Sequence, residues 1–171
     1  MSIIEDVGAL VKQGKLIERA SSLLNIRARN LYVVPDLDAF TRPPFQDTLE
    51  GERYAAIAQY FDAFCELNMI SVSQNPHQKP ADTMLARVHP IEQEFWSMRI
   101  VDPEETAGIR VFGAFCAKDS FVALAYEFRE HIDDFDAEVA EANDLWNDHF
   151  GKTAPFSGNN LNDYLTNYTE F

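Results

Sequence analysis

Two arginines stand in segments that are otherwise apolar, and of all the residues in this sequence they are best suited to act on an anion. Arg99 lies in WSMRI and Arg110 in GIRVF. A charged side chain in an apolar strand must reach an open face of the sheet or pair with a carboxylate. Pairing with nearby acids is the structural interpretation. The functional interpretation is an anion-contacting sheet face, with Tyr126, Arg129 and Lys118 nearby.

Other arrangements typical of catalysis are missing from the sequence. The seven glycines are scattered and form no phosphate-binding loop, and neither G-x-S-x-G nor H-E-x-x-H occurs. No two of the four histidines have a spacing that suggests a metal pair. Cys65 and Cys116 lie in apolar surroundings, which favours buried free thiols over a disulfide framework. We therefore predict no cofactor and no metal centre.

The charge of the chain is strongly negative and unevenly spread. The net charge is −14, of which residues 1–90 hold −2 and residues 91–171 hold −12. Such a surface repels phosphate backbones and anionic lipid headgroups, so binding to nucleic acids and to membranes is disfavoured. The first fifteen residues lack the basic n-region of a signal peptide, and no apolar run reaches the ~20 residues that span a bilayer. The sequence thus predicts a cytoplasmic protein.

The order of the apolar patterns predicts an α+β fold. Residues 94–126 predict a three-stranded antiparallel meander, because EFWSMRIV alternates and two later apolar runs flank a polar joint at 117–120. Residues 31–34 are a candidate fourth strand of this small sheet. Amphipathic helices are expected over residues 3–24, 48–67 and 132–150.

The whole chain, residues 1–171, is expected to form a single compact domain, in which residues 1–30 are an N-terminal helical segment. A composition that is 46% hydrophobic, with thirteen Phe, suffices to bury a core without disulfides. Gly113, in the middle of an apolar run, predicts a β-bulge or the close approach of another element.

The last long helix combines an apolar stripe with many acidic residues. The stripe recurs at spacings of three and four and consists of Phe128, Ile132, Phe135, Val139, Ala142 and Trp146. The carboxylates within 133–148 lie opposite this stripe, so we expect them to be hydrated rather than to form catalytic acid–base pairs. Such a face can attract a basic protein partner.

Residues 95–130 resemble the central strands of the RelE-like toxins, a superfamily of mRNA endonucleases. The family pattern is an aromatic-x-leucine-arginine strand, a strand with arginine near its start and an apolar strand, and here WSMR and IRV occupy the first two places. The resemblance implies an RNase site of Arg99, Arg110, Tyr126 and Arg129, whose arginines hold the scissile phosphate. This chain departs from the family in two ways: EFRE replaces the usual basic pair, and the C-terminal half is acidic.

Three classes of function remain open from the sequence. The first is a non-catalytic interaction protein with an acidic docking face, such as an inhibitor, an immunity-type protein or an adaptor. The second is a RelE-like mRNA endonuclease or an inactive relative. The third is an enzyme of unknown class, whose site is assembled from residues that are distant in sequence. The sequence does not exclude a homo-oligomer.

Overall fold

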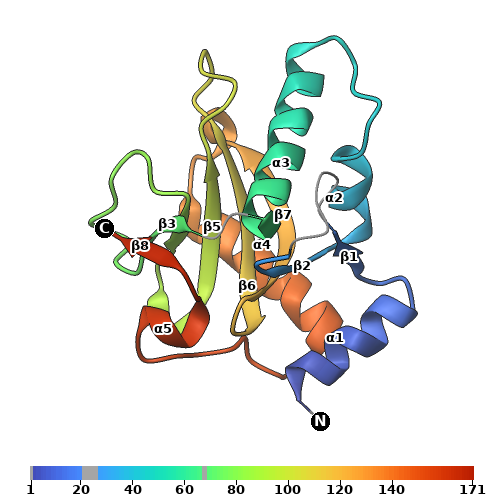
Figure 1. Cartoon of the computed structure of the whole chain (residues 1–171), viewed down its shortest axis with the longest axis vertical. Helices are drawn as coiled ribbons and strands as arrows, with labels where there is room; N and C mark the ends of the chain where they lie inside the picture. Colours follow the sequence, from blue (N-terminus) through green and yellow to red (C-terminus); the bar gives the residue numbers. More distant parts are fainter. Residues whose placement is uncertain (1, 21–26, 67–68) are drawn as a thin grey trace.

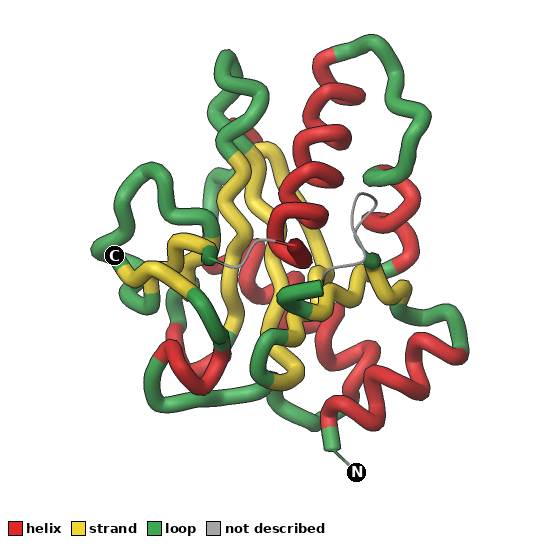
Figure 2. Tube along the Cα trace, in the orientation of Figure 1, coloured by secondary structure: helices red, strands yellow, loops and turns green. Residues whose placement is uncertain are grey.

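The protein is built around a mixed, strongly curled β-sheet that forms a half-barrel (Figure 1). The computed structural model describes residues 2–20, 27–66 and 69–171. Within these ranges the fold is α+β, with five α-helices and eight strands in the order β1-β2-β7-β6-β5-β4-β3-β8. None of the described helices is long and apolar enough to cross a membrane. Figure 2 follows the chain through the same view, with helices and strands distinguished by colour.

The middle of the sheet is the antiparallel meander that the sequence predicts. β5 (Phe95–Ile100), β6 (Ile109–Ala117) and β7 (Ser120–Phe128) are consecutive neighbours, each antiparallel to the next. β2 (Asn30–Val33) pairs with β7 in parallel, so the candidate fourth strand is confirmed as part of the same sheet.

Gly113 combines both features that were expected of it. The register of β6 and β7 shifts between Phe112 and Gly113, which is a β-bulge. A Cβ at this position would collide with the carbonyl oxygen of Val122 and with the ring of Phe121. The absence of a side chain here therefore lets β6 and β7 stay paired.

The sheet is larger than the predicted three- or four-stranded one. It also contains β1 (Ile17–Arg19), β3 (Ile70–Ser73), β4 (Leu85–Arg87) and β8 (Tyr168–Glu170). β1 is antiparallel to β2 and β4 is antiparallel to β5, whereas β3 runs parallel to both β4 and β8. Each of these strands has three or four residues, too few for an alternating pattern to stand out in the sequence.

The prediction of a helix over 3–24, within a helical segment 1–30, is wrong after its first half. α1 (Ile3–Lys12) begins at the capping box formed by Ser2 and Glu5 and ends before Gly14, whose φ is +70°. The chain then enters β1. Residues 21–26 lie outside the described residues, so the end of the predicted helix is not tested there.

The two later helices lie close to their predicted positions. α3 (Leu49–Glu66) matches the helix expected over 48–67, of which residue 67 lies outside the described part. α4 (Phe135–Phe150) begins later than residue 132, because a 3-10 turn, η2 (Arg129–His131), follows β7. Two short helices, α2 (Pro35–Phe40) and α5 (Leu161–Tyr164), were not predicted.

The two faces of the sheet carry separate apolar cores. α3 covers one face, where Phe61 and Phe64 are fully buried, and α4 and α1 cover the other, where Trp146 is fully buried (Figure 1). Trp96, Met98 and Ile100 of β5 belong to the core under α3. Since side chains alternate along a strand, Arg99 projects from the α4 side of the sheet.

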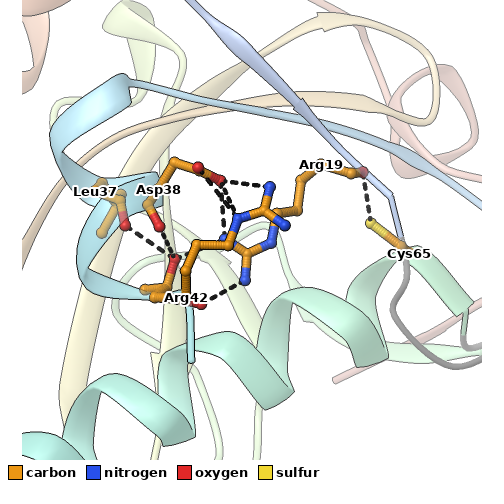
Figure 3. Close-up of polar contacts among 6 residues, drawn as sticks. Arg19, Leu37, Asp38, Arg42 and Cys65 are labelled. Atoms are coloured by element: carbon orange, nitrogen blue, oxygen red, sulfur yellow. Dashed lines mark hydrogen bonds and ion pairs between the residues drawn. The ribbon is translucent and has the colours of Figure 1, made fainter. Parts of the chain in front are cut away.

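A buried arginine holds α2 against β1 (Figure 3). Arg19 Nη1 donates to Asp38 Oδ1 at 2.9 Å and to Thr41 Oγ1 at 2.8 Å, and the carboxylate of Asp38 also accepts from Arg42. Arg19 is 5% exposed, and burial lowers the pKa of its guanidinium, whereas Asp38 opposes this shift. Here the fold compensates a buried positive charge with a carboxylate.

Candidate functional site

Arg99 and Arg110 lie side by side on neighbouring strands. They are register partners in β5 and β6, and both are half-buried. Arg99 Nη1 donates to the carbonyl oxygen of Pro80 at 2.7 Å, and Arg110 Nη1 donates to the carbonyl oxygen of Ile109 at 3.0 Å. Each guanidinium thus finds backbone acceptors rather than a carboxylate.

Arg129 adds a third positive charge from the turn η2. Its backbone N–H donates to the carbonyl oxygen of Gly108 at 2.9 Å, which fixes the turn beside the start of β6. Its guanidinium lies over the ring of Phe135, 5.0 Å from the ring centroid. Because Phe135 packs against the core under α4, Arg129 lies on the same side of the sheet as Arg99 and Arg110.

Lys79 adds a fourth positive charge from the loop between β3 and β4. It precedes Pro80, the residue that accepts the hydrogen bond from Arg99. Lys79 is half-buried, and its charge interacts with those of all three arginines. We call these four residues, Lys79, Arg99, Arg110 and Arg129, the cation cluster.

The positive charges of the cation cluster destabilise one another. Burial lowers the pKa of Arg110 to about 10, with further contributions from the charges of Arg99 and Arg129. Burial also lowers the pKa of Lys79, and Arg99, Arg110 and Arg129 all act in the same direction. Repulsion of this kind is weak between hydrated side chains but grows as the surroundings lose water.

No carboxylate forms an ion pair with the cation cluster among the residues that the structure describes, although the chain contains 28 acidic residues. Five other arginines do have carboxylate partners: Arg19, Arg27, Arg42, Arg53 and Arg87. Glu127 is the register partner of Arg110, but its Oε1 accepts from the N–H of Phe128 at 2.8 Å and lies 3.4 Å from Nδ1 of His131. The fold thus pairs these five arginines with carboxylates, whereas Arg29 donates to the carbonyl oxygens of Phe64, Thr166 and Asn167.

Two buried polar atoms beside Arg99 also lack a hydrogen-bond partner within the described ranges. They are Nε of Arg99 itself and the hydroxyl oxygen of Thr83, a residue that is 1% exposed. The carbonyl oxygen of Thr83 lies 3.5 Å from Arg99 Nη1, so both atoms belong to one neighbourhood. Unsatisfied buried polar atoms destabilise a fold. Nε of Arg53, an arginine with a carboxylate partner, is buried without a hydrogen bond in these ranges as well, so the four like charges, and not these atoms, distinguish this end of the sheet.

Three of the four predicted site residues lie together, and the fourth does not. Tyr126 lies on the α3 side of the sheet, where its hydroxyl oxygen is 3.0 Å from that of Tyr54. Lys118, also considered as a neighbour, lies in the turn at the far end of β6 from Arg110. Sequence reasoning missed Lys79, because it sits in a polar loop with no periodic signal and only the Arg99–Pro80 hydrogen bond brings that loop to the site.

The acidic residues of the last helix form a second charged region, on the outside of α4. We call this set the acidic face: Asp133, Asp134, Asp136, Glu138, Glu141, Asp144 and Asp148. All are exposed except Glu138, which is half-buried and whose pKa is raised by burial and by neighbouring carboxylates, Glu141 first. In the described part of the chain no Lys or Arg forms an ion pair with any of them, and His89 lies 3.8 Å from Asp136.

A pocket of about 950 Å³ lies between the β3–β4 loop and the C-terminal strand. It is lined by His77, His89 and Arg87, among others, and the two imidazole ring centroids are 6.1 Å apart. Across residues 2–20, 27–66 and 69–171, no group of three or more His, Cys, Asp or Glu side chains is arranged to hold a metal ion. This pocket therefore has no chemistry as distinctive as that of the cation cluster.

Comparisons with known proteins add no assignment to these regions. No protein-family model, no curated protein and no solved structure matches the chain. The resemblance of residues 95–130 to the RelE-like toxins is thus not tested by them, and a function has to be inferred from the cation cluster and the acidic face themselves.

Proposed function

We propose that this protein binds a small anionic molecule, one that bears a phosphate or carboxylate group, in the cation cluster. The observation that supports this proposal is the convergence of four half-buried cations without a carboxylate ion pair in the described residues. A bound anion would offset the mutual repulsion of these charges. Guanidinium groups also bind phosphate and carboxylate oxygens through strong, geometrically defined hydrogen bonds.

The surroundings of the cation cluster favour a small ligand over a polyanion. The acidic face begins at Asp133, four residues after Arg129, and the charge of Asp82 acts on Arg99. A nucleic acid held at the cluster would extend beyond it and meet these carboxylates. A RelE-like RNase activity, or an inactive relative of such an enzyme, is therefore the weaker proposal. The position of Tyr126 on the other side of the sheet also weighs against a shared four-residue site.

Calorimetric titration with inorganic phosphate at low ionic strength tests the proposed function. Arg110→Gln should weaken binding about tenfold or more, because a charge-assisted hydrogen bond contributes about 1.5–3 kcal/mol. Arg42→Gln is the matched control: it removes the same charge from a side chain that is 48% exposed and lies outside the cluster. The proposal fails if the wild type does not bind phosphate, or if both variants weaken binding equally.

Docking of a basic protein on the acidic face is the second candidate, and in that role the protein would be a non-catalytic inhibitor, immunity-type protein or adaptor. The specific observation in its favour is that exposed carboxylates follow one helix and form no ion pair with Lys or Arg among the described residues. Complementary charge accelerates association, and this acceleration falls as salt rises.

A lysine-rich peptide of defined sequence serves as the probe for this second candidate. Neutralising Asp136, Glu141 and Asp144 should slow its association about tenfold at low salt, since focused surface charge raises on-rates by about that factor or more. The control neutralises three exposed acids of the β5–β6 loop: Asp102, Glu104 and Glu105. Equal slowing by the two triple variants would mean that net charge, not the acidic face, drives association. An RNA degradation assay with wild type and Arg99→Ala, run alongside, tests the RNase alternative.

A further inference from the structure

We propose that Lys79 is a nucleophilic amine that forms an imine with a small aldehyde or ketone bearing a phosphate or carboxylate group. This inference rests on the proposed anion site, because the arginines of the cation cluster would hold the anionic group while the lysine reacts with the carbonyl carbon. It concerns a different event from anion binding, since a covalent bond forms and can be detected separately.

The geometry of the β3–β4 loop places Lys79 beside the arginines. The hydrogen bond from Arg99 Nη1 to Pro80 ties the loop to β5 one residue after Lys79. Arg99 is the register partner of Arg110, and Arg129 reaches the same side of the sheet from η2. Lys79 is half-buried and has no hydrogen bond or ion pair to another described residue, so its amine is not committed to a structural contact.

The charges around Lys79 favour the reactive form of its amine. A lysine attacks a carbonyl only when it is neutral, and neighbouring cations and partial burial both disfavour its ammonium form. The pKa of Lys79 is lowered by burial first and then by Arg99, Arg110 and Arg129, with no opposing carboxylate. The four other lysines are exposed: Lys12, Lys15, Lys118 and Lys152. They provide an internal comparison within the same protein.

The reaction balances without an oxidant or a reductant. Nζ of the neutral lysine attacks the carbonyl carbon, and a C–N bond forms as the C=O π bond opens. The two protons of the amine pass to the former carbonyl oxygen, which leaves as water, and a C=N bond remains. Water reverses the reaction, so a free ligand and an unmodified lysine exchange with the imine.

The experiment uses pyridoxal 5′-phosphate as the probe and pyridoxal, which has the same aldehyde but no phosphate, as its control. Each is mixed with the full-length protein, sodium borohydride reduces the imines formed, and peptide mass mapping gives the labelled fraction at each of the five lysines. Lys79 should be labelled first of the five by pyridoxal 5′-phosphate. Labelling by pyridoxal should be about tenfold slower, because a local concentration of positive charge raises the local concentration of anions by that factor or more.

Variants and competition separate this inference from the proposed function. Arg110→Gln and an excess of inorganic phosphate should both slow the labelling of Lys79, whereas Arg42→Gln should not. If phosphate binds in calorimetry but Lys79 is labelled no faster than the four exposed lysines, the nucleophile proposal is overturned and the anion site stands. If phosphate does not bind and both aldehydes label Lys79 equally, the anion site fails, and with it the ligand class proposed here.

Discussion

The cation cluster and the acidic face belong to the same side of the sheet, and their like charges are arranged in opposite ways. The cluster draws four half-buried side chains from β5, β6, η2 and the β3–β4 loop to one place. The acidic face spreads its carboxylates along the outside of α4, where nearly all are exposed. Burial adds to repulsion in the first region, and water screens it in the second.

Because of this difference, the two regions are not equally strong candidates for a functional site. An exposed row of carboxylates needs no ligand to be stable, and it keeps a protein soluble. A convergent, partly dehydrated group of cations lowers stability unless something compensates it, and the other arginines named above show that this fold does supply carboxylates elsewhere. Sites that lower stability without a structural reason are often functional. The cation cluster is therefore the stronger candidate.

The acidic face exists only while α4 stays packed on the sheet, and Trp146 is the residue that should matter most for this. Its side chain is fully buried, and its indole N–H donates to the carbonyl oxygen of Thr153 at 2.7 Å. Trp146→Ala should lower the free energy of unfolding by about 3–5 kcal/mol, the usual loss for a large aromatic core residue. Denaturant melts measure the loss, and one below about 1 kcal/mol would mean that α4 is not anchored by its apolar side.

A substitution of Arg19 tests whether a carboxylate partner stabilises a buried arginine in this fold. Arg19→Met should lower the free energy of unfolding by about 3 kcal/mol, because it breaks a buried ion pair and removes a donor to the backbone of Thr41. Asp38 keeps its ion pair with Arg42, which limits the loss of stability. Chemical denaturation followed by circular dichroism gives this value, and a stability equal to that of the wild type would show that carboxylate pairing is not what compensates buried arginines here.

A substitution of Arg110 tests whether an arginine of the cation cluster lowers the stability of the ligand-free protein. Arg110→Met should leave the free energy of unfolding unchanged or raise it by about 1 kcal/mol, because it relieves repulsion with Arg99 and Arg129 and keeps an apolar stem of similar length. The same denaturation protocol applies as for Arg19→Met. A loss comparable to that of Arg19→Met would identify Arg110 as a structural residue and contradict the comparison.

The smallest effect is expected on the acidic face itself. Asp136→Asn should change the free energy of unfolding by at most about 0.5 kcal/mol, as surface substitutions usually do. Its side chain is 72% exposed. Thermal melts at low and high salt measure this change. A larger change that persists at high salt would mean that Asp136 makes a contact that salt does not screen.

The meander and the two long helices could be predicted because their patterns are long. β5 alternates over six residues, and α3 and α4 each carry an apolar stripe over four turns or more. The short strands could not be predicted in this way, because their place in the sheet depends on partners far along the chain. β8, for example, pairs with β3, almost a hundred residues earlier. The helix predicted over 3–24 extended too far because Leu16 and Ile17 fit its spacing, although they belong to the connection and strand after Gly14.

Prediction of the candidate site from the sequence is limited in the same way, because it depends on contacts between distant segments. Arg99 and Arg110 stood out because each interrupts an apolar strand, and the register of β5 and β6 brings them to one face of the sheet. Tyr126 lies apart from these arginines, because the register of β6 and β7 makes it the partner of Val111, on the α3 side. Lys79 has no sequence signal of its own, since the contact that places it joins a loop to a strand nineteen residues away.

The central claim, that an anion compensates the cation cluster, is tested most directly by measuring the unfolding free energies of wild type and Arg110→Met with and without inorganic phosphate. Without phosphate, the variant should be at least as stable as the wild type. With phosphate at about 100 times the wild-type Kd, the wild type should gain about 2.7 kcal/mol, because a ligand that binds the folded state stabilises it by mass action. The variant, which should bind about tenfold more weakly or worse, should gain at most about 1.4 kcal/mol. In the presence of phosphate the wild type should then be more stable than Arg110→Met. If phosphate changes neither protein, or stabilises both equally, the cation cluster is not an anion-binding site.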